Sequence, residues 1–325
     1  MKGENILMLA KTAIVGSSIA DALGVPVEFK SREYLFNNPV KSYMEYGTHY
    51  QPKGTWSDDT SMTLCLMESM IECKRIDYCN IMDKFVLWKD KGEFTPFNYT
   101  FDIGNATYKA IKRYQSGIQP TECGGSAIYD NGNGSLMRIM PMVLFVYKNK
   151  EQLGNKGIAE SIINCSKLTH AHPISLSACM IFYGIIERLL ERDIDDKMKI
   201  LDEGIIRGKS LYTEYTGQNI THEYDRIKDV RRFALNSSDE IKSSGYVVDT
   251  LESAIWCFVN YNSYKESVLA AVNLGDDTDT VGAVTGGLAA LYYGYEEIPD
   301  RWIEGLQRRE YVIELCNKFD DFLTL

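Results

Sequence analysis

Three common signatures are missing from this 325-residue sequence. No two of its eight cysteines are spaced as C-x-x-C, which excludes the usual zinc-ribbon and thioredoxin motifs. No stretch approaches the ~18 uncharged apolar residues that a membrane span needs. The N-terminal apolar patch is interrupted by Glu4 and Lys11, so it is a poor secretory signal. These absences favour a cytoplasmic protein with reduced cysteines.

An excess of positive charge is also missing, because the net charge is −10 and the isoelectric point is near 5.1. This balance argues against general binding to nucleic acids or membrane surfaces. An acidic site can still bind an anion when a cation lies between the two. The sequence has no linker rich in proline, glycine or serine, no low-complexity tract and no repeat of fixed period. We therefore expect a single domain over residues 1–325.

Alternating patterns typical of β-strands are scarce, and helical spacing dominates the chain. Apolar residues recur at steps of three and four in segments such as Ile6–Ile14, Ile174–Leu189 and Val248–Val259. We predict an all-α fold. A short β-ribbon within residues 27–50 is left open. The charged, weakly periodic segment 197–232 is interpreted as an insertion or as a peripheral pair of helices.

Two acidic turns, one near each end of the chain, each open an apolar helix. The first contains Ser57, Asp58 and Asp59, and the second contains Asp276 to Thr280. Helix capping explains either turn alone, because serine and aspartate are preferred N-caps. Capping needs one acceptor, however, and three crowded aspartates repel one another and raise each other's pKa. Carboxylate and hydroxyl oxygens are ligands of hard cations such as Mg²⁺. Two facing turns of this kind therefore predict a site for two metal ions.

Small residues follow the second acidic turn at once, among them Gly282, Gly286 and Gly287. Glycine costs roughly 1 kcal/mol relative to alanine in a helix interior. Several glycines in one helix therefore indicate a geometric demand. We expect a central, buried helix that its neighbours approach closely.

Other polar positions give weaker signals. Glu28 lies between apolar residues, so burial would raise the pKa of its carboxyl group. Asp102 reads as a cap at a helix entry, and Asp21 as a surface or capping acid. The loop 131–135, followed by a helix over residues 136–140, could hold phosphate with its backbone N–H groups. An ordinary turn is the alternative.

The motifs together resemble the ADP-ribosylglycohydrolase family. They span most of the chain in the family's order, and they read ADALGVPVEF (20–29), GTWSDDTSM (54–62), DIGNAT (102–107), NGNGSLMRIMP (131–141), LTHAHP (168–173), SGYVVDTLESAIW (244–256) and NLGDDTDTVGAVTGGLAALYYG (273–294). The resemblance implies a compact domain of orthogonal helices with a central binuclear Mg²⁺ site. Mn²⁺ is the alternative, since both ions accept oxygen ligands.

The resemblance also implies roles for individual residues. Glu28 matches the glutamate implicated in catalysis, and Asp102 an aspartate near the substrate ribose. The implied metal ligands are Ser57, Asp58, Asp59, Asp277, Asp279 and Thr280. The implied substrate-binding residues are Gly124, Gly125, Ser126, Asn133, Gly134, Ser135 and His172.

Three positions depart from the family pattern. Ala20 replaces a glycine, Ser57 replaces the commoner threonine, and Asp276 stands where many members have glycine. None of these changes removes a metal ligand. We interpret Asp276 as additional charge behind the ligands.

The activity implied is hydrolysis of the glycosidic bond between ADP-ribose and a protein or small-molecule acceptor, by a monomer. The alternatives are a binuclear-metal phosphohydrolase, which would release AMP, and a non-catalytic ADP-ribose-binding protein. The sequence leaves the acceptor open.

Overall fold

The computed structural model describes residues 8–191, 193, 196–219 and 222–324. Within these residues, every element of regular secondary structure is a helix. The α-helices are α1 (Leu9–Gly24), α2 (Arg32–Asn37), α3 (Asp58–Cys73), α4 (Tyr78–Lys91), α5 (Asn105–Gln115), α6 (Met140–Lys148), α7 (Lys150–Lys167), α8 (Pro173–Glu191), α9 (Lys197–Thr216), α10 (Val230–Phe233), α11 (Val247–Asn260), α12 (Tyr264–Val272), α13 (Thr278–Tyr293), α14 (Asp300–Gly305) and α15 (Arg309–Phe322). The all-α prediction is confirmed.

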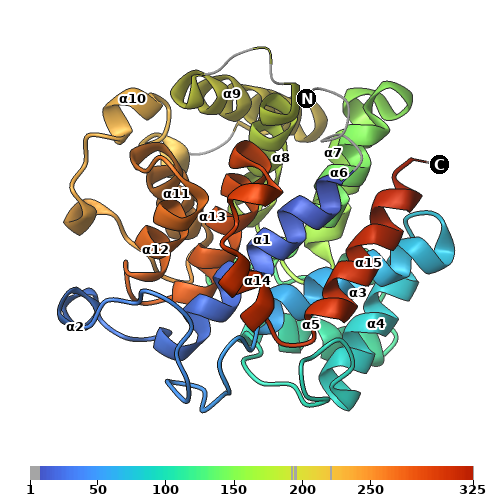
Figure 1. Cartoon of the computed structure of the whole chain (residues 1–325). Helices are drawn as coiled ribbons and strands as arrows, with labels where there is room; N and C mark the ends of the chain where they lie inside the picture. Colours follow the sequence, from blue (N-terminus) through green and yellow to red (C-terminus); the bar gives the residue numbers. More distant parts are fainter. Residues whose placement is uncertain (1–7, 192, 194–195, 220–221, 325) are drawn as a thin grey trace.

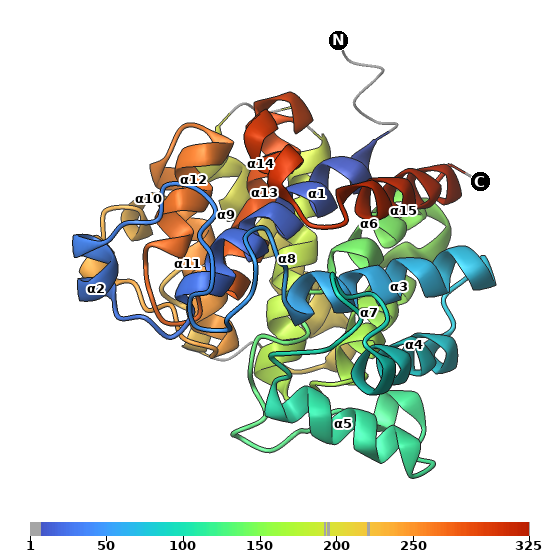
Figure 2. The ribbon, with the colours of Figure 1, turned by 60° about the horizontal axis from the view of Figure 1, so that its bottom comes forward.

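Helices α1 and α13 lie against each other at the centre of the molecule, and the other helices surround them (Figure 1). Helices α11 and α12 cover α13 on one side, whereas α3 and α15 cover α1 on the other (Figure 2). Helices α6 to α8 pack behind this pair, and α9 lies outside α8. Helix α9 and the short α10 therefore form a peripheral helical pair, which was one of the two expectations for residues 197–232.

Small residues bring α1 and α13 into contact. A Cβ atom added at Gly286 would lie 2.6 Å from the Cβ atom of Ala20 and 2.6 Å from the carbonyl oxygen of Gly16. A Cβ atom at Gly16 would lie 2.4 Å from that of Ala290. The space left by Gly286 is thus occupied by Ala20, the residue that replaces a glycine of the family pattern. Helix α13 is buried along nearly its whole length, as expected.

Side chains from distant parts of the chain bind both ends of α1. Asp320 of α15 accepts hydrogen bonds from the N–H groups of Ala10 (2.7 Å) and Lys11 (3.0 Å), which have no partner within the helix. At the other end, the hydroxyl of Thr278 donates to the carbonyl oxygen of Gly24 at 2.8 Å. The C-terminus of α1 is thereby held against the N-terminus of α13, where the second acidic turn lies.

Three local expectations are corrected. Residues 27–50 contain a 3-10 turn, α2 and irregular loop, with no strand. The helix expected over residues 136–140 begins only at Met140, so the loop 131–135 does not open directly into a helix. Asp102 is not a cap, because α5 starts at Asn105 with Gly104 at its N-cap and Asp102 has a left-handed φ of 53°.

Helix α8 is the one described helix that is long and apolar enough to cross a membrane. Most of it is buried inside the protein, against α7, α9 and α11. A continuous apolar helix of this kind is what a core position requires.

We predict that Gly286→Ala destabilises the protein by about 1–3 kcal/mol, because the new methyl group would press on Ala20 and on the backbone of Gly16. Gly287→Ala is a matched control in the same helix. Its methyl group would come as near as 3.0 Å only to the flexible end of Met140. Denaturant unfolding of both variants checks this. Equal stability of the two would contradict the close approach of α1 and α13.

Candidate metal centre and active site

The first acidic turn is built on a buried aspartate. The carboxylate of Asp21 accepts hydrogen bonds from the N–H of Ser57 (2.9 Å), the hydroxyl of Thr60 (2.6 Å) and the N–H of Thr60 (3.1 Å). Ser57 is the N-cap of α3, as predicted, and its hydroxyl lies 3.4 Å from the N–H of Asp59. Of the two expectations for Asp21, the surface acid is wrong, because the residue is fully buried. The capping acid is confirmed, since Asp21 accepts N–H groups at the start of α3 from across the chain.

The second acidic turn meets the first. Asp277 occupies the N-cap position of α13, but its side chain makes no capping hydrogen bond. The hydroxyl of Thr280 lies 3.3 Å from an oxygen of Asp59, so the two turns are in contact although 221 residues separate these positions. An oxygen of each of Glu28, Asp277 and Asp279 lies within 4.8 Å of the others.

Several carboxylate oxygens at this junction are buried and have no hydrogen-bond donor. They are Oδ1 of Asp59, Oδ1 of Asp277 and Oδ2 of Asp279. Burial, followed by the charges of neighbouring acids, raises the pKa of Asp59 and Asp279 well above its usual range. A bound cation would satisfy these three unpaired acceptor atoms. The donor set, all carboxylate and hydroxyl oxygen, fits Mg²⁺ or Mn²⁺.

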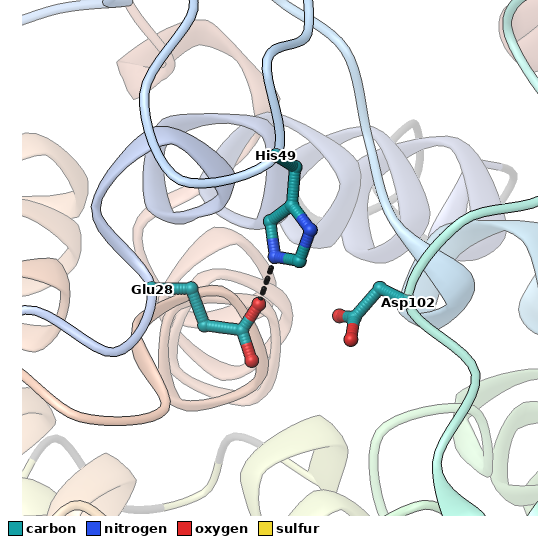
Figure 3. A group of neighbouring side chains, drawn as sticks. All are labelled: Glu28, His49 and Asp102. Atoms are coloured by element: carbon teal, nitrogen blue, oxygen red, sulfur yellow. Dashed lines mark hydrogen bonds and ion pairs between the residues drawn. The ribbon is translucent and has the colours of Figure 1, made fainter.

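Glu28 lies at the edge of this centre, with His49 and Asp102 beside it (Figure 3). The Nε2 atom of His49 bonds Oε2 of Glu28, and Figure 3 shows the other carboxylate oxygen directed away from the ring. Burial raises the pKa of Glu28 to about 8, against the hydrogen bond from His49. Burial lowers the pKa of His49, but its hydrogen bond to Glu28 and the charges of Glu28, Asp102 and Asp21 together leave the pKa raised. One proton is therefore readily shared by this pair.

Backbone hydrogen bonds join the Glu28 turn to the second acidic turn. The N–H of Phe29 donates to the carbonyl oxygen of Asp276 at 2.7 Å, and the N–H of Asp276 donates to that of Lys30 at 2.9 Å. Both Phe29 (φ 62°) and Asp276 (φ 59°) have a left-handed backbone conformation. Glycine adopts this conformation most easily, and aspartate is among the residues that tolerate it. This explains why Asp276 can replace a family glycine. Its side chain is exposed, which corrects its interpretation as charge behind the ligands.

A cavity of about 330 Å³ opens beside the two turns. Hollows of about 820 and 500 Å³ lie elsewhere on the protein, but neither is lined by a residue of the acidic turns. We therefore take the cavity of about 330 Å³ as the candidate active site, because residues of both acidic turns line it. Carboxylates, polar groups and two exposed aromatic rings line it, and they include Glu28, Asp58, Asp102, Asp277, Thr107, Asn133, His170, Phe29 and Tyr129.

The residues of the loop 131–135 are divided between the cavity and the core. Asn133 and Gly134 line the cavity, and the amide of Asn133 donates to Oδ2 of Asp277 at 2.8 Å. Asn133 thus contacts a predicted metal ligand as well as the cavity. The side chain of Ser135 is fully buried, and its hydroxyl accepts a hydrogen bond from that of Ser166 at 2.9 Å.

The loop 124–126 lies apart from the cavity lining. The N–H of Gly124 donates to the carbonyl oxygen of Lys167 at 2.8 Å, and that of Gly125 to Thr169 at 3.3 Å. These N–H groups are already used, so they hold the segment 167–171. Ser126 is exposed.

The two histidines of LTHAHP have different positions. His172 accepts the N–H of Ile174 at 3.3 Å, at the start of α8, and does not line the cavity. His170 does line it and is almost completely buried. His49, Asp21 and His170 were missed as site residues in the sequence. His49 stands in an irregular loop outside the recognised motifs, whereas Asp21 and His170 lie inside them.

A helical fold with a buried acidic centre suited to metal cations, beside a cavity, is typical of a metal-dependent α-helical enzyme. Residues 4–324 match the family described as ADP-ribosylglycohydrolase, and the chain belongs to that family. It is therefore an enzyme that hydrolyses the glycosidic bond between ADP-ribose and an acceptor. This finding displaces the phosphohydrolase and the purely binding protein as interpretations.

Relatives from several organisms agree with this assignment. The chain is 33% identical to ADP-ribosylarginine hydrolase Tri1 of Serratia proteamaculans, over 95% of this chain and 78% of the relative. It is 26% identical to ADP-ribosyl-[dinitrogen reductase] glycohydrolase of Rhodospirillum rubrum, over 95% and 94%. A solved structure described as an ADP-ribosylglycohydrolase-related protein complex superposes with a TM-score of 0.78 at 28% identity, over 98% of this chain and 99% of the other.

We predict that Mg²⁺ stabilises the protein more at about pH 8 than at about pH 5.5. Folding raises the pKa of Asp21 to about 7 and of Glu28 to about 8, so these carboxyl groups favour the folded state when protonated. Stability of the metal-free protein falls as the pH rises through this window. The raised pKa of Asp59 and Asp279 means that a cation at these carboxylates also competes with protons there. At a free Mg²⁺ concentration of about a hundred times Kd, binding would raise the free energy of unfolding by about 2.7 kcal/mol.

Thermal unfolding with EDTA or with Mg²⁺ at both pH values measures this difference. Asp279→Asn is the control, because it removes a charge from the centre and should abolish most of the Mg²⁺ effect. An equal rise in Tm at the two pH values would show that Mg²⁺ does not compete with protons at Asp59 and Asp279.

Proposed function

We propose that the enzyme removes ADP-ribose from arginine side chains, with two Mg²⁺ ions at the junction of the acidic turns. The observation that carries the proposal is the acidic edge of the cavity, where Glu28, Asp58 and Asp102 lie near the exposed ring of Phe29. Carboxylates and an aromatic face both favour a planar guanidinium cation. The relative named as an ADP-ribosylarginine hydrolase supports the same linkage.

The proposed metal ligands are Ser57, Asp58, Asp59, Asp277, Asp279 and Thr280. When bound, the cations supply positive charge that neutralises these acids and orients oxygen atoms of the substrate. Asn133 would keep Asp277 in position through its amide hydrogen bond. Asp21 does the same for the first turn, since it binds the backbone and side chains of Ser57 and Thr60.

Hydrolysis breaks the bond between C1″ of the ribose and a guanidine nitrogen, and it joins C1″ to the oxygen of water. The ribose gains positive charge in the transition state, which Asp102 and the other carboxylates of the cavity stabilise. Glu28 takes a proton from the water or delivers one to the departing nitrogen. His49 holds Oε2 of Glu28, so the carboxyl group keeps its orientation toward the cavity.

The proposal makes Gly134 and its neighbours in the loop 131–135 part of the cradle for the diphosphate. Gly134 lines the cavity without a side chain, so a charged group can approach its backbone closely. The loop 124–126 would act indirectly, because its backbone holds the segment that carries His170.

The first test is a panel of arginine-linked and serine-linked ADP-ribosyl peptides and O-acetyl-ADP-ribose, each with Mg²⁺ or EDTA. We expect release of intact ADP-ribose from the arginine-linked peptide with Mg²⁺ and none with EDTA. The product is identified by mass. Release from the serine-linked peptide or from O-acetyl-ADP-ribose alone would reject the arginine linkage. AMP as the product would reject glycosidic cleavage.

We predict that Glu28→Gln lowers kcat by roughly 10²- to 10⁴-fold, because the amide cannot exchange the proton. Binding of Mg²⁺ and of ADP-ribose should persist, since the amide can still contact His49. Glu33→Gln on α2 is a matched control at an exposed position and should leave kcat unchanged. Full activity of Glu28→Gln would remove Glu28 from the mechanism.

A further inference from the structure

Arg138 is a fully buried cation, and its partners among the described residues are all uncharged. Its Nη2 atom lies 2.7 Å from the hydroxyl oxygen of Thr169 and 3.2 Å from the carbonyl oxygen of Cys165, and its guanidinium group lies over the ring of Phe85. Burying a guanidinium group without a carboxylate is expensive. The proposed reaction gives Arg138 no part, so its position calls for another explanation.

A short chain of hydrogen bonds connects Arg138 to His170 in the cavity. Arginine has only donors, so Nη2 donates to the hydroxyl oxygen of Thr169. That oxygen lies 2.9 Å from Nδ1 of His170. Thr169 is fully buried, and the ring nitrogen is the acceptor within reach of its hydroxyl hydrogen. A hydrogen on Nδ1 would leave the buried hydroxyl hydrogen of Thr169 without an acceptor, which is unfavourable.

The opposite ring nitrogen of His170 faces the glycines of the loop 131–135. A Cβ atom at Gly132 would lie 3.6 Å from Nε2, and one at Gly134 would lie 3.4 Å from it and 2.8 Å from Cε1. Side chains at these positions would crowd the ring. The glycines therefore leave Nε2 accessible from the cavity, next to the proposed diphosphate cradle.

We propose that Arg138 and Thr169 are positioning residues that hold His170 as a neutral ring with its hydrogen on Nε2. His170 then presents a fixed N–H donor to an oxygen of the ADP-ribose in the cavity. This inference rests on the proposed function for the ligand, but the state of the ring can be measured without any substrate.

The electrostatic surroundings agree with a neutral ring. Burial, together with the charge of Arg138, lowers the pKa of His170 to about 3, and the more distant Asp130 opposes this effect. A neutral donor does not change its protonation across the physiological range, unlike an ordinary histidine. Substrate contact at this position would therefore be insensitive to pH.

The test is NMR of the full-length protein labelled with ¹⁵N-histidine, without substrate. The chain has four histidines, and His170→Asn assigns the signals. We expect one ring with its hydrogen on Nε2 and no titration between about pH 5.5 and 8. If none of the four rings keeps a hydrogen on Nε2 without titrating in this range, the proposal is overturned by the wild-type protein alone, whether or not the variant folds.

Two variants then test the chain of hydrogen bonds from Arg138 through Thr169 to His170. Thr169→Val keeps the shape but removes the hydroxyl, and we expect His170 to populate both tautomers and the Kd for ADP-ribose with Mg²⁺ to rise roughly tenfold. Thr169→Ser keeps the hydroxyl and should restore both properties. A purely structural role would not produce the change in tautomer. An unchanged Kd in Thr169→Val would remove the binding role.

The outcome is separable from that of the proposed function. If the wild-type protein shows the Nε2–H ring and binds ADP-ribose but cleaves no arginine-linked peptide, the acceptor is wrong and the positioning role remains. If it cleaves the peptide but His170 titrates, the positioning role is wrong and the arginine linkage remains.

Discussion

The structure depends on one electrostatic constraint, the burial of several carboxylates at a single junction. Asp59, Asp277 and Asp279 each have an oxygen that is shielded from water and bonded to no donor. Such a group is unfavourable in a metal-free protein, because burial and mutual repulsion both oppose ionisation. Bound cations turn the same arrangement into a stable one. The folded state is therefore linked to its metal, and the stability of the enzyme and its chemistry draw on the same side chains.

Bringing the two acidic turns together requires two helices to approach more closely than ordinary side chains allow. The glycines of α13 and the small residues of α1 provide that approach, and Thr278 secures it by bonding the last carbonyl group of α1. The approach carries a cost in helix propensity, since glycine is unfavourable in a helix interior. A separation larger by one methyl group would move the carboxylate oxygens of the two turns apart, and these are the oxygens that would hold the cations.

Around this centre, a second set of residues holds the functional side chains in position. Asp21 organises the first turn, His49 orients Glu28, and Asn133 contacts Asp277. The residues in these contacts are separated by 36, 21 and 144 positions in the sequence. Left-handed backbone at Phe29 and Asp276 joins the turn of Glu28 to the second acidic turn. These connections explain how Glu28 and the second acidic turn, which lie about 250 residues apart in the sequence, are held next to each other.

The sequence by itself determined the helical class, the buried small-residue helix and the two acidic turns, because periodicity, composition and like-charge crowding are local properties. It also identified the family through its motifs. Only the tertiary structure decided the partners. His49 belongs to no periodic pattern, and only the packing of its loop brings it to Glu28. His170 faces the cavity, whereas His172 accepts the N–H of Ile174 at the N-terminus of α8. Neither the burial of Asp21 nor the exposure of Asp276 has a local signal, since both depend on which distant segment covers the residue.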